Sequence, residues 1–252
     1  MKNTLSHEFY KMIHQRSSWI AFIVLFGLMI YSATPISYID KNLVSQGFGA
    51  GQWVIIIAIA LSSNFIDMEF RDSTMATLLY KSPNRWSVFI SKLIVLIVYN
   101  FLLLVFSFLF AVILKYILVN DKFNWNILYH HHTLINALLI NLSGVAIYLL
   151  FIITFSLMLI SIVKSNAIVI VVGLFIGFLG STFSNVFMQA LPSLKTLIAW
   201  NPLNMINVIV QLSNPNIAQS SALTNGELIV GNLIYSIVFL LIGIYAFKKR
   251  RL

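Results

Sequence analysis

The sequence predicts an all-α integral membrane protein, with six transmembrane helices in a single transmembrane domain over residues 1–252. Two observations carry this prediction. Of the 252 residues 60% are hydrophobic and only 9% are charged, whereas a soluble domain carries about 25% charged residues. In addition, six apolar segments reach the length of about 20 residues that a helix needs to cross a hydrocarbon core. An ordinary soluble fold is therefore excluded.

The six predicted spans follow one another along the chain at 19–38, 48–66, 93–114, 134–160, 167–188 and 228–247. The first span is too long, and too closely followed by the second, to be a cleaved signal peptide. The fifth contains Gly173, Gly177 and Gly180, a spacing of small residues that lets helices approach closely. We therefore expect these glycines to lie at helix contacts.

The basic residues give the orientation of the spans. Twelve of the 16 Lys and Arg residues lie at the chain ends and in the loops after spans two and four, and four lie in the other loops. The positive-inside rule therefore places both termini in the cytoplasm. The net charge of +9 serves topology and contact with anionic lipid, because the basic residues flank apolar runs and do not form the patch that nucleic acid requires.

Two further elements flank the spans. Residues 1–18 predict an interfacial helix, since one helical face carries Leu5, Phe9, Met12, Ile13 and Arg16. Residues 189–226 predict an external hairpin of two short helices, 191–200 and 203–212, broken at Asn201-Pro202. Irregular backbone at membrane depth must be buried against protein, so the hairpin should pack on the spans.

The loop after span two, residues 67–87, combines charged and apolar side chains. Capping residues at 73–74 and the stop signal Pro83-Asn84 predict a short amphipathic helix between them. The charges of the loop are costly to bury unpaired, and its leucines are too apolar to leave in water. We therefore expect a partner protein to cover this helix.

The pattern of this loop resembles that of the membrane subunits of type 2 ATP-binding-cassette (ABC) exporters. It consists of Glu69, Thr74, Leu78, Pro83, Arg85 and Lys92 after the second of six spans. The resemblance extends over nearly the whole chain, although Ser73 stands where that family usually has glycine. The compact length is most similar to the permeases of Gram-positive bacteriocin, lantibiotic-immunity and bacitracin exporters, and of the staphylococcal phenol-soluble-modulin exporter.

The resemblance implies a permease that exports amphipathic peptides or peptide antibiotics across the bacterial cell membrane by alternating access. Its partners would be two copies of an ABC ATPase, which hold ATP and Mg, and a second permease that is identical or related. The residues that would couple to the ATPase are Glu69, Arg71, Asp72, Met75 and Leu78. The residues that would line the substrate path are Trp53, Ile57, Asn64, Phe175, Phe178 and Phe183.

Several function classes lack their residues. There is no phosphate-binding P-loop, so the chain binds no nucleotide in that manner. No catalytic constellation exists, since Lys11 stands where a zinc-protease motif starting at His7-Glu8 needs its second histidine. Three adjacent histidines, 130–132, and the lack of cysteine predict no metal site. We therefore expect neither an enzyme nor a cofactor on this chain.

Two alternatives stay open. A self-sufficient secondary transporter or channel usually carries an ionisable group at mid-membrane, and no acid falls within the six predicted spans. Four asparagines lie in or near spans, where bonding to a neighbouring helix is the more common role and substrate binding the rarer one. They are Asn64, Asn100, Asn136 and Asn141.

Overall fold

Long apolar helices dominate the computed structural model, which describes residues 2–71, 84–119 and 122–249. Five of them are long and apolar enough to span a membrane, or six if the bent pair α1 and α2 counts as one span. The five are α4 (Ala50–Arg71), α6 (Arg85–Val119), α7 (Leu134–Val163), α8 (Asn166–Ala190) and α12 (Asn225–Lys249). They coincide with predicted spans two to six, so the prediction of an all-α, multi-pass membrane protein is confirmed.

The first predicted span is shorter than expected. Helix α1 (Lys2–His14) meets α2 (Arg16–Ser32) at a bend of 54°, and α2 ends at Ser32, six residues before the predicted end at residue 38. Pro35 has no N–H to continue the helix, and a 3-10 turn, η1 (Ile36–Tyr38), follows it. The short helix α3 (Lys41–Ser45), capped by the Asp40 side chain, leads into α4.

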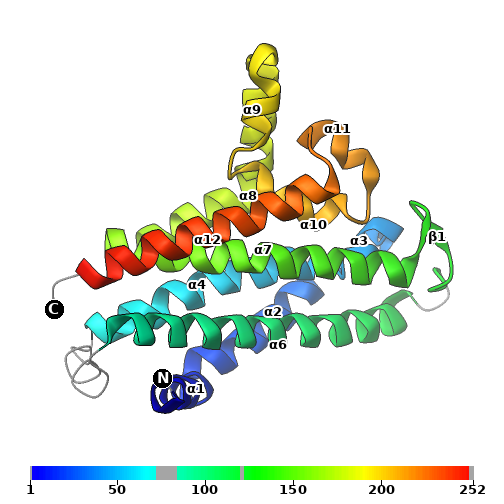
Figure 1. Ribbon diagram of the computed structural model, residues 1–252. Coiled ribbons are helices and arrows are strands. Elements are labelled where there is room, and N and C mark those ends of the chain that lie inside the picture. Colours follow the sequence, from blue (N-terminus) through cyan, green and yellow to red (C-terminus); the bar gives the residue numbers. More distant parts are fainter. Residues whose placement is uncertain (1, 72–83, 120–121, 250–252) are drawn as a thin grey trace.

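Both chain ends lie at the same end of the bundle, together with the end of α4 and the start of α6 (Figure 1). We call this the terminal end. The opposite end, where α3 and β1 lie, is called the hairpin end (Figure 1). An even number of crossings brings both chain ends to one side, as this arrangement has them.

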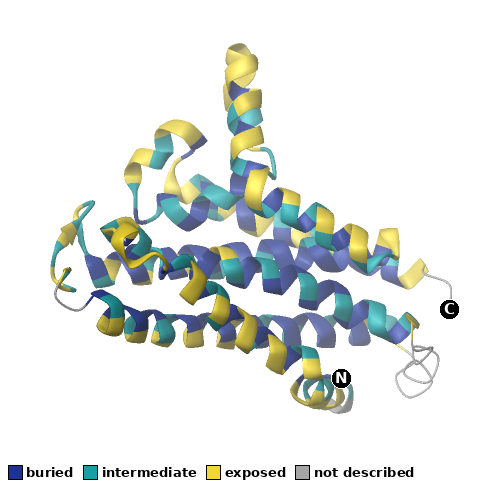
Figure 2. Cartoon of the chain, turned by 180° about the vertical axis from the view of Figure 1, so that it is seen from behind, coloured by how far each residue is buried: buried dark blue, intermediate teal, exposed yellow. Residues whose placement is uncertain are grey.

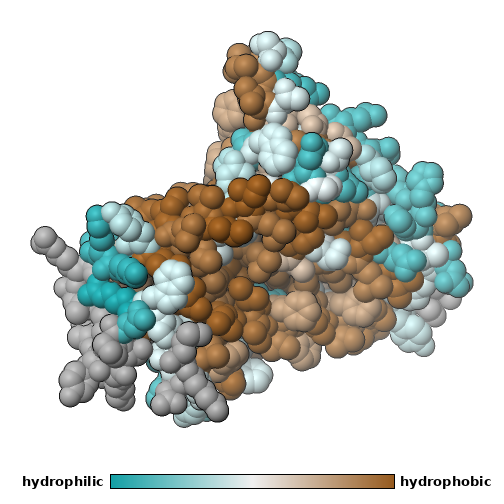
Figure 3. Space-filling view, viewed as in Figure 1, coloured by the Kyte–Doolittle hydropathy of each residue, from teal (hydrophilic) through white to brown (hydrophobic). Residues whose placement is uncertain are grey.

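Helix α7 lies at the centre of the bundle and packs against α4, α6, α10 and α12. Of its most apolar stretch 67% is buried, against 28% for α8. The buried faces turn toward one another and the exposed faces turn outward (Figure 2). On the face that Figure 3 shows, apolar side chains cover the middle of the bundle and hydrophilic ones gather toward its two ends, which is the distribution that a bilayer requires.

The segment after α8 is more broken than the two predicted helices. It forms η2 (Pro192–Leu194), α9 (Lys195–Ala199), η3 (Asn204–Asn207), α10 (Val208–Gln211), η4 (Pro215–Ile217) and α11 (Ala218–Ser221). Helix α9 projects away from the bundle (Figure 1), whereas α10 returns to pack on α7. The predicted break is present: the Asn201 amide donates to Ser184 Oγ at 2.9 Å and to the Ile198 carbonyl at 2.6 Å.

A small β-hairpin, which was not predicted, follows α6. Strands β1 (Leu128–Tyr129) and β2 (His132–Thr133) pair antiparallel, and His130 and His131 form the turn with positive φ, as two-residue hairpin turns require. Within the described ranges, no group of three His, Cys, Asp or Glu residues could hold a metal ion.

Candidate functional site

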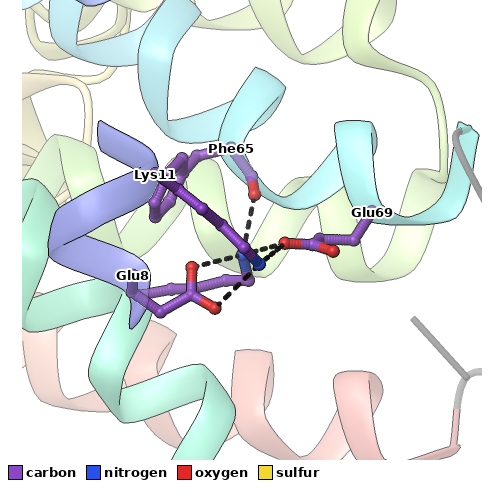
Figure 4. Close-up of polar contacts among 5 residues, drawn as sticks. Glu8, Lys11, Phe65 and Glu69 are labelled. Carbon is purple, nitrogen blue, oxygen red and sulfur yellow. Dashed lines mark hydrogen bonds and ion pairs between the residues drawn. The ribbon is translucent and has the colours of Figure 1, made fainter. Parts of the chain in front are cut away.

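Four charged side chains from three helices meet at the terminal end. We call them the ion-pair cluster: Glu8 and Lys11 of α1, Glu69 of α4 and Lys92 of α6. Lys92 Nζ donates to Glu8 Oε2 at 2.9 Å and to Glu69 Oε1 at 3.1 Å. Lys11 Nζ donates to Glu69 Oε1 at 2.5 Å and to Glu8 Oε1 at 3.3 Å. Each cation therefore bridges both carboxylates (Figure 4).

The cluster is neutral and almost fully buried. The side chains of Glu8 and Lys92 are 0% exposed and that of Glu69 is 2% exposed. Lys92 also donates to the Phe65 carbonyl at 3.1 Å, so its ammonium has three acceptors for its three protons. The Phe65 ring lies 4.3 Å from the same nitrogen. Removal of Lys92, the cation that water does not reach, would leave an uncompensated buried charge, which costs about 3–5 kcal/mol.

Lys11 is the member that water reaches, with 33% of its side chain exposed. Partial burial lowers the pKa of its ammonium, but the carboxylates of Glu8 and Glu69 outweigh burial, and the net pKa is raised above the ordinary value. Lys11 is therefore charged at any physiological pH.

The sequence of α1 places two members of the cluster on one face. Glu8 and Lys11 are three residues apart, a spacing that brings side chains together on a helix. Met12 lies beside them with 2% exposure, whereas Ile13 is 57% exposed. The predicted face of α1 is thus divided: Met12 is buried against the chain and Ile13 is exposed on its surface, while the side of α1 that packs on α6 passes through Glu8, which pairs with Lys92.

The start of α6 is held by a second contact. Arg85 Nη1 donates to the carbonyl oxygen of Lys248 near the end of α12 at 2.8 Å, and Lys248 Nζ lies 5.8 Å from the Trp86 ring. The two elements that flank residues 72–83 are thus each tied to another helix, α4 to α1 and α6 to α12.

The predicted coupling residues fall into three groups. Glu69 is buried in the ion-pair cluster, and Arg71 is exposed at the end of α4. Asp72, Met75 and Leu78 lie outside the described residues. The chain itself thus supplies the partner that the charge of Glu69 needs, which was expected from another protein.

The predicted path residues of α4 do not face α8. Trp53 donates its indole N–H to Ser32 Oγ of α2 at 2.8 Å, and Ile57 and Asn64 continue its helical face. The side of α4 toward α8 carries Ile55 and Ile59. Trp53, Ile57 and Asn64 therefore lie about 160° around the helix from the side that packs on α8, on nearly the opposite face.

The predicted path residues of α8 share a surface. Phe175, Phe178 and Phe183 are 41%, 46% and 38% exposed, and the Phe175 and Phe183 rings are 5.0 Å apart. Together with neighbouring aliphatic side chains they give α8 an apolar face that no described part of the chain covers.

The three predicted glycines lie at contacts of different closeness. A Cβ at Gly173 would be 2.5 Å from Ile59 Cγ2 of α4, and one at Gly180 would be 3.1 Å from the Leu203 carbonyl oxygen. At Gly177 the nearest atom would be at 3.9 Å. A closer backbone approach was missed, because a Cβ at Gly144 would lie 2.5 Å from the carbonyl oxygen of Val208.

Sequence reasoning also missed Glu8 and Lys11 as site residues, and it found Lys92 only as part of the resemblance. One signal was present. Two acids and two bases lie near helix ends that the positive-inside rule assigns to the same membrane surface, where opposite charges can pair.

Comparison with curated proteins gave no significant match. A family model described as "Protein of unknown function (DUF2705)" matches residues 7–252, which include all four residues of the ion-pair cluster. The chain therefore belongs to the DUF2705 family.

Proposed function

We propose that this chain is the permease subunit of an ATP-driven exporter of the type 2 ABC kind. The observation that carries the proposal is the attachment of residues 72–83 on both sides: Glu69 is joined to α1 and α6 by the ion-pair cluster, and Arg85 is joined to α12. A force on this segment would act on four helices together, as a coupling loop requires.

The proposed mechanism is alternating access. An ATPase on the cytoplasmic side, which holds ATP and Mg²⁺, closes on nucleotide and presses on residues 72–83. Because the ion-pair cluster joins α1, α4 and α6, these helices move as one group, and the space between two permeases switches from inward to outward access.

The coupling residues take two roles in this mechanism. Exposed Arg71, with Asp72, Met75 and Leu78, contacts the ATPase. Glu69 has a positioning role, because its buried carboxylate is bonded to Lys11 and Lys92 and is not directed at a partner.

The proposed cargo is an amphipathic peptide or peptide antibiotic. The exposed apolar face of α8, with Phe175, Phe178 and Phe183, supports this. A second permease, identical or related, would enclose an apolar passage between itself and this face. Both termini lie at one end of the bundle, which agrees with their assignment to one side of the membrane. The positive-inside rule supports the cytoplasm of a bacterial cell as that side.

Copurification tests the partner. We expect a gene for an ABC ATPase beside the gene of this chain, and the full chain is produced together with that ATPase and isolated in mild detergent. We expect the ATPase to copurify and Leu78→Asp to lower its amount about tenfold. Leu128→Asp is the matched control, since Leu128 is 72% exposed at the hairpin end. Equal recovery with Leu78→Asp would refute the coupling assignment.

Glu69→Gln separates the two roles. The variant keeps the ATPase bound, because it leaves the contact surface intact, but it weakens transport per ATP hydrolysed. Loss of ATPase binding in this variant would contradict a positioning role.

The absence of cysteine from the chain allows a clean test of topology. An impermeant maleimide should label Asn124→Cys on intact cells and Asn84→Cys only after permeabilisation. Reversed access would overturn the orientation. Solute movement by the chain alone in liposomes would replace the proposal with a self-sufficient secondary transporter or channel.

A further inference from the structure

A pocket of about 220 Å³ lies toward the hairpin end, among α4, α7, α8 and the segment η3 to α10. This is space for roughly seven water molecules. The polar side chains that line it are Gln46, Gln52, Asn141, Ser181 and Asn207. They alternate with apolar ones, among them Ile55, Phe178 and Ile209. The pocket therefore combines an apolar wall with several hydrogen-bonding groups.

The polar groups in this pocket are neutral. None of the described residues that line it is ionisable, so a charged ligand would lose its hydration without a counter-charge, which is costly. Amide and hydroxyl side chains both donate and accept hydrogen bonds. This chemistry suits an uncharged group that itself has a donor and an acceptor.

Asn141 of α7 has a buried hydrogen-bond donor among the residues that line the pocket. Its side chain is 1% exposed, and its amide nitrogen has no hydrogen-bond partner in the part of the chain that the structure describes. A buried donor without an acceptor destabilises the protein, and an acceptor bound in the pocket would recover the lost free energy.

Close backbone packing shapes the walls around the pocket. Gly144, one turn from Asn141, admits the backbone of Val208 against α7, and Gly177 leaves the α8 wall without a side chain beside Ile55. At the rim, Gly47, Phe48 and Gly49 have φ of 60°, 55° and 75°. Phe48 adopts this strained conformation while 0% exposed.

We propose that this pocket binds an uncharged amide group within an apolar ligand, and that Asn141 donates to its carbonyl oxygen. In the context of the proposed function, on which this assignment of ligand rests, the group is a backbone or side-chain amide of the peptide cargo. Of the six predicted path residues only Phe178 lines the pocket. The inference thus adds the amides of α4 and α7 to the path.

Equilibrium binding to the full chain in nanodiscs, without any ATPase, tests the proposal. The probe is tritiated N-acetyl-leucyl-leucinamide, and N-acetyl-leucyl-leucine carries a carboxylate in place of the terminal amide. We expect saturable binding of the amide and at least about tenfold weaker binding of the acid. Asn141→Leu should weaken amide binding about tenfold, the equivalent of one hydrogen bond of about 1.4 kcal/mol.

Two variants keep the result interpretable. Asn100→Leu is the matched control, because Asn100 is also a buried amide within a span but lies on α6, away from the pocket; its affinity should stay within about twofold of wild type. Gln52→Leu alters an exposed lining residue, so it weakens binding without a burden on folding. Unsaturable uptake that is equal in wild type, Asn141→Leu and Gln52→Leu would overturn the proposal.

The outcomes of the two proposals are separable. If the probe fails to bind while the ATPase copurifies, the pocket assignment falls and the exporter stands. If the probe binds through Asn141 while no ATPase associates, the pocket stands as the site of another class of transporter.

Discussion

The two ends of the helical bundle bury polar groups by different chemistry. At the terminal end, the ion-pair cluster joins residues as far apart in sequence as Glu8 and Lys92, which are separated by 84 positions. At the hairpin end, neutral side chains bond within a short stretch of the chain. We call Asn204, Gln211 and Ser221, each 0% exposed, the amide network.

The amide network satisfies local backbone. Asn204 Nδ2 donates to the carbonyl oxygens of Ala199 at 2.6 Å and Ser221 at 2.8 Å. Gln211 Nε2 donates to the Leu223 carbonyl at 2.8 Å, and Ser221 Oγ donates to Gln211 Oε1 at 2.5 Å. Pro192, Pro202 and Pro215 interrupt regular helix in this segment. The side-chain bonds satisfy backbone carbonyl groups there in place of helical hydrogen bonds.

The difference teaches how each end can move. Separation of the ion-pair cluster would expose a charge to an apolar interior, so α1, α4 and α6 are held as one unit. Loss of one neutral hydrogen bond costs only about 1 kcal/mol, so the segment from Ala199 to Leu223 can rearrange by itself. In the proposed mechanism the terminal end would transmit force and the hairpin end would adapt.

The strongest test of this contrast is Lys92→Met. It keeps the volume of the side chain but leaves Glu8 and Glu69 with Lys11 as their shared cation. We expect a loss of about 3–5 kcal/mol of stability, measured as a large fall in the thermal unfolding temperature in detergent. The double variant Lys92→Met with Glu69→Gln should recover part of this loss. A Lys92→Met protein as stable as wild type would break the comparison.

Close backbone packing at the hairpin end should be the next largest effect. In Gly144→Ala the new methyl group would meet the Val208 carbonyl at 2.5 Å, and a backbone atom can yield only by displacement of α10. Such overpacking costs about 1–3 kcal/mol.

Gly27→Ala is the control for this substitution, because a Cβ at Gly27 meets no atom within 4 Å and alanine favours a helix by about 1 kcal/mol. Gly27→Ala should therefore be neutral or more stable than wild type. The same thermal unfolding measurement applies, and equal destabilisation by both substitutions would contradict the role of the contact.

The spans were predictable because the length and apolarity of a segment follow from its own sequence and do not depend on contacts with other segments. The face of α4 that meets α8 was not predictable, because α4 is apolar nearly all round and such a helix gives no pattern that selects one face. The same limit hid Gly144, whose partner is the backbone of a segment that returns more than 60 residues later.

The candidate site was predictable only in part. The resemblance marked Glu69, Arg85 and Lys92, and the structure pairs Glu69 with Lys92 and joins Arg85 to the end of α12. It could not pair Lys92 with Glu8, because a choice among several opposite charges at one membrane surface depends on how α1 bends against α6.

Asn204→Ala tests the local character of the amide network. The variant loses the two hydrogen bonds to carbonyl groups and a third that Asn204 Oδ1 accepts from Asn207 Nδ2 at 2.7 Å. Each contributes about 1 kcal/mol, and we expect the loss to stay within the segment. Limited proteolysis should cleave between residues 199 and 223 faster, while the unfolding temperature of the bundle changes less than in Gly144→Ala. A cooperative loss as large as that of Lys92→Met would remove the distinction between the two ends.

Lys11→Met gives the smallest effect and shows whether burial sets the strength of the ion-pair cluster. Lys11 makes two ion pairs as Lys92 does, but a third of its side chain reaches water, so screening reduces its contribution to about 0.5–1 kcal/mol. The pKa of Lys11 is raised above its ordinary value of 10.5, so its contribution is complete below pH 10.5 and declines as the pH rises through the raised pKa. The stability difference between wild type and Lys11→Met should therefore be constant between pH 7 and 9 and shrink at more alkaline pH, as thermal unfolding of both proteins across this range can measure. A loss equal to that of Lys92→Met would mean that the number of ion pairs, and not their burial, decides the strength of the cluster.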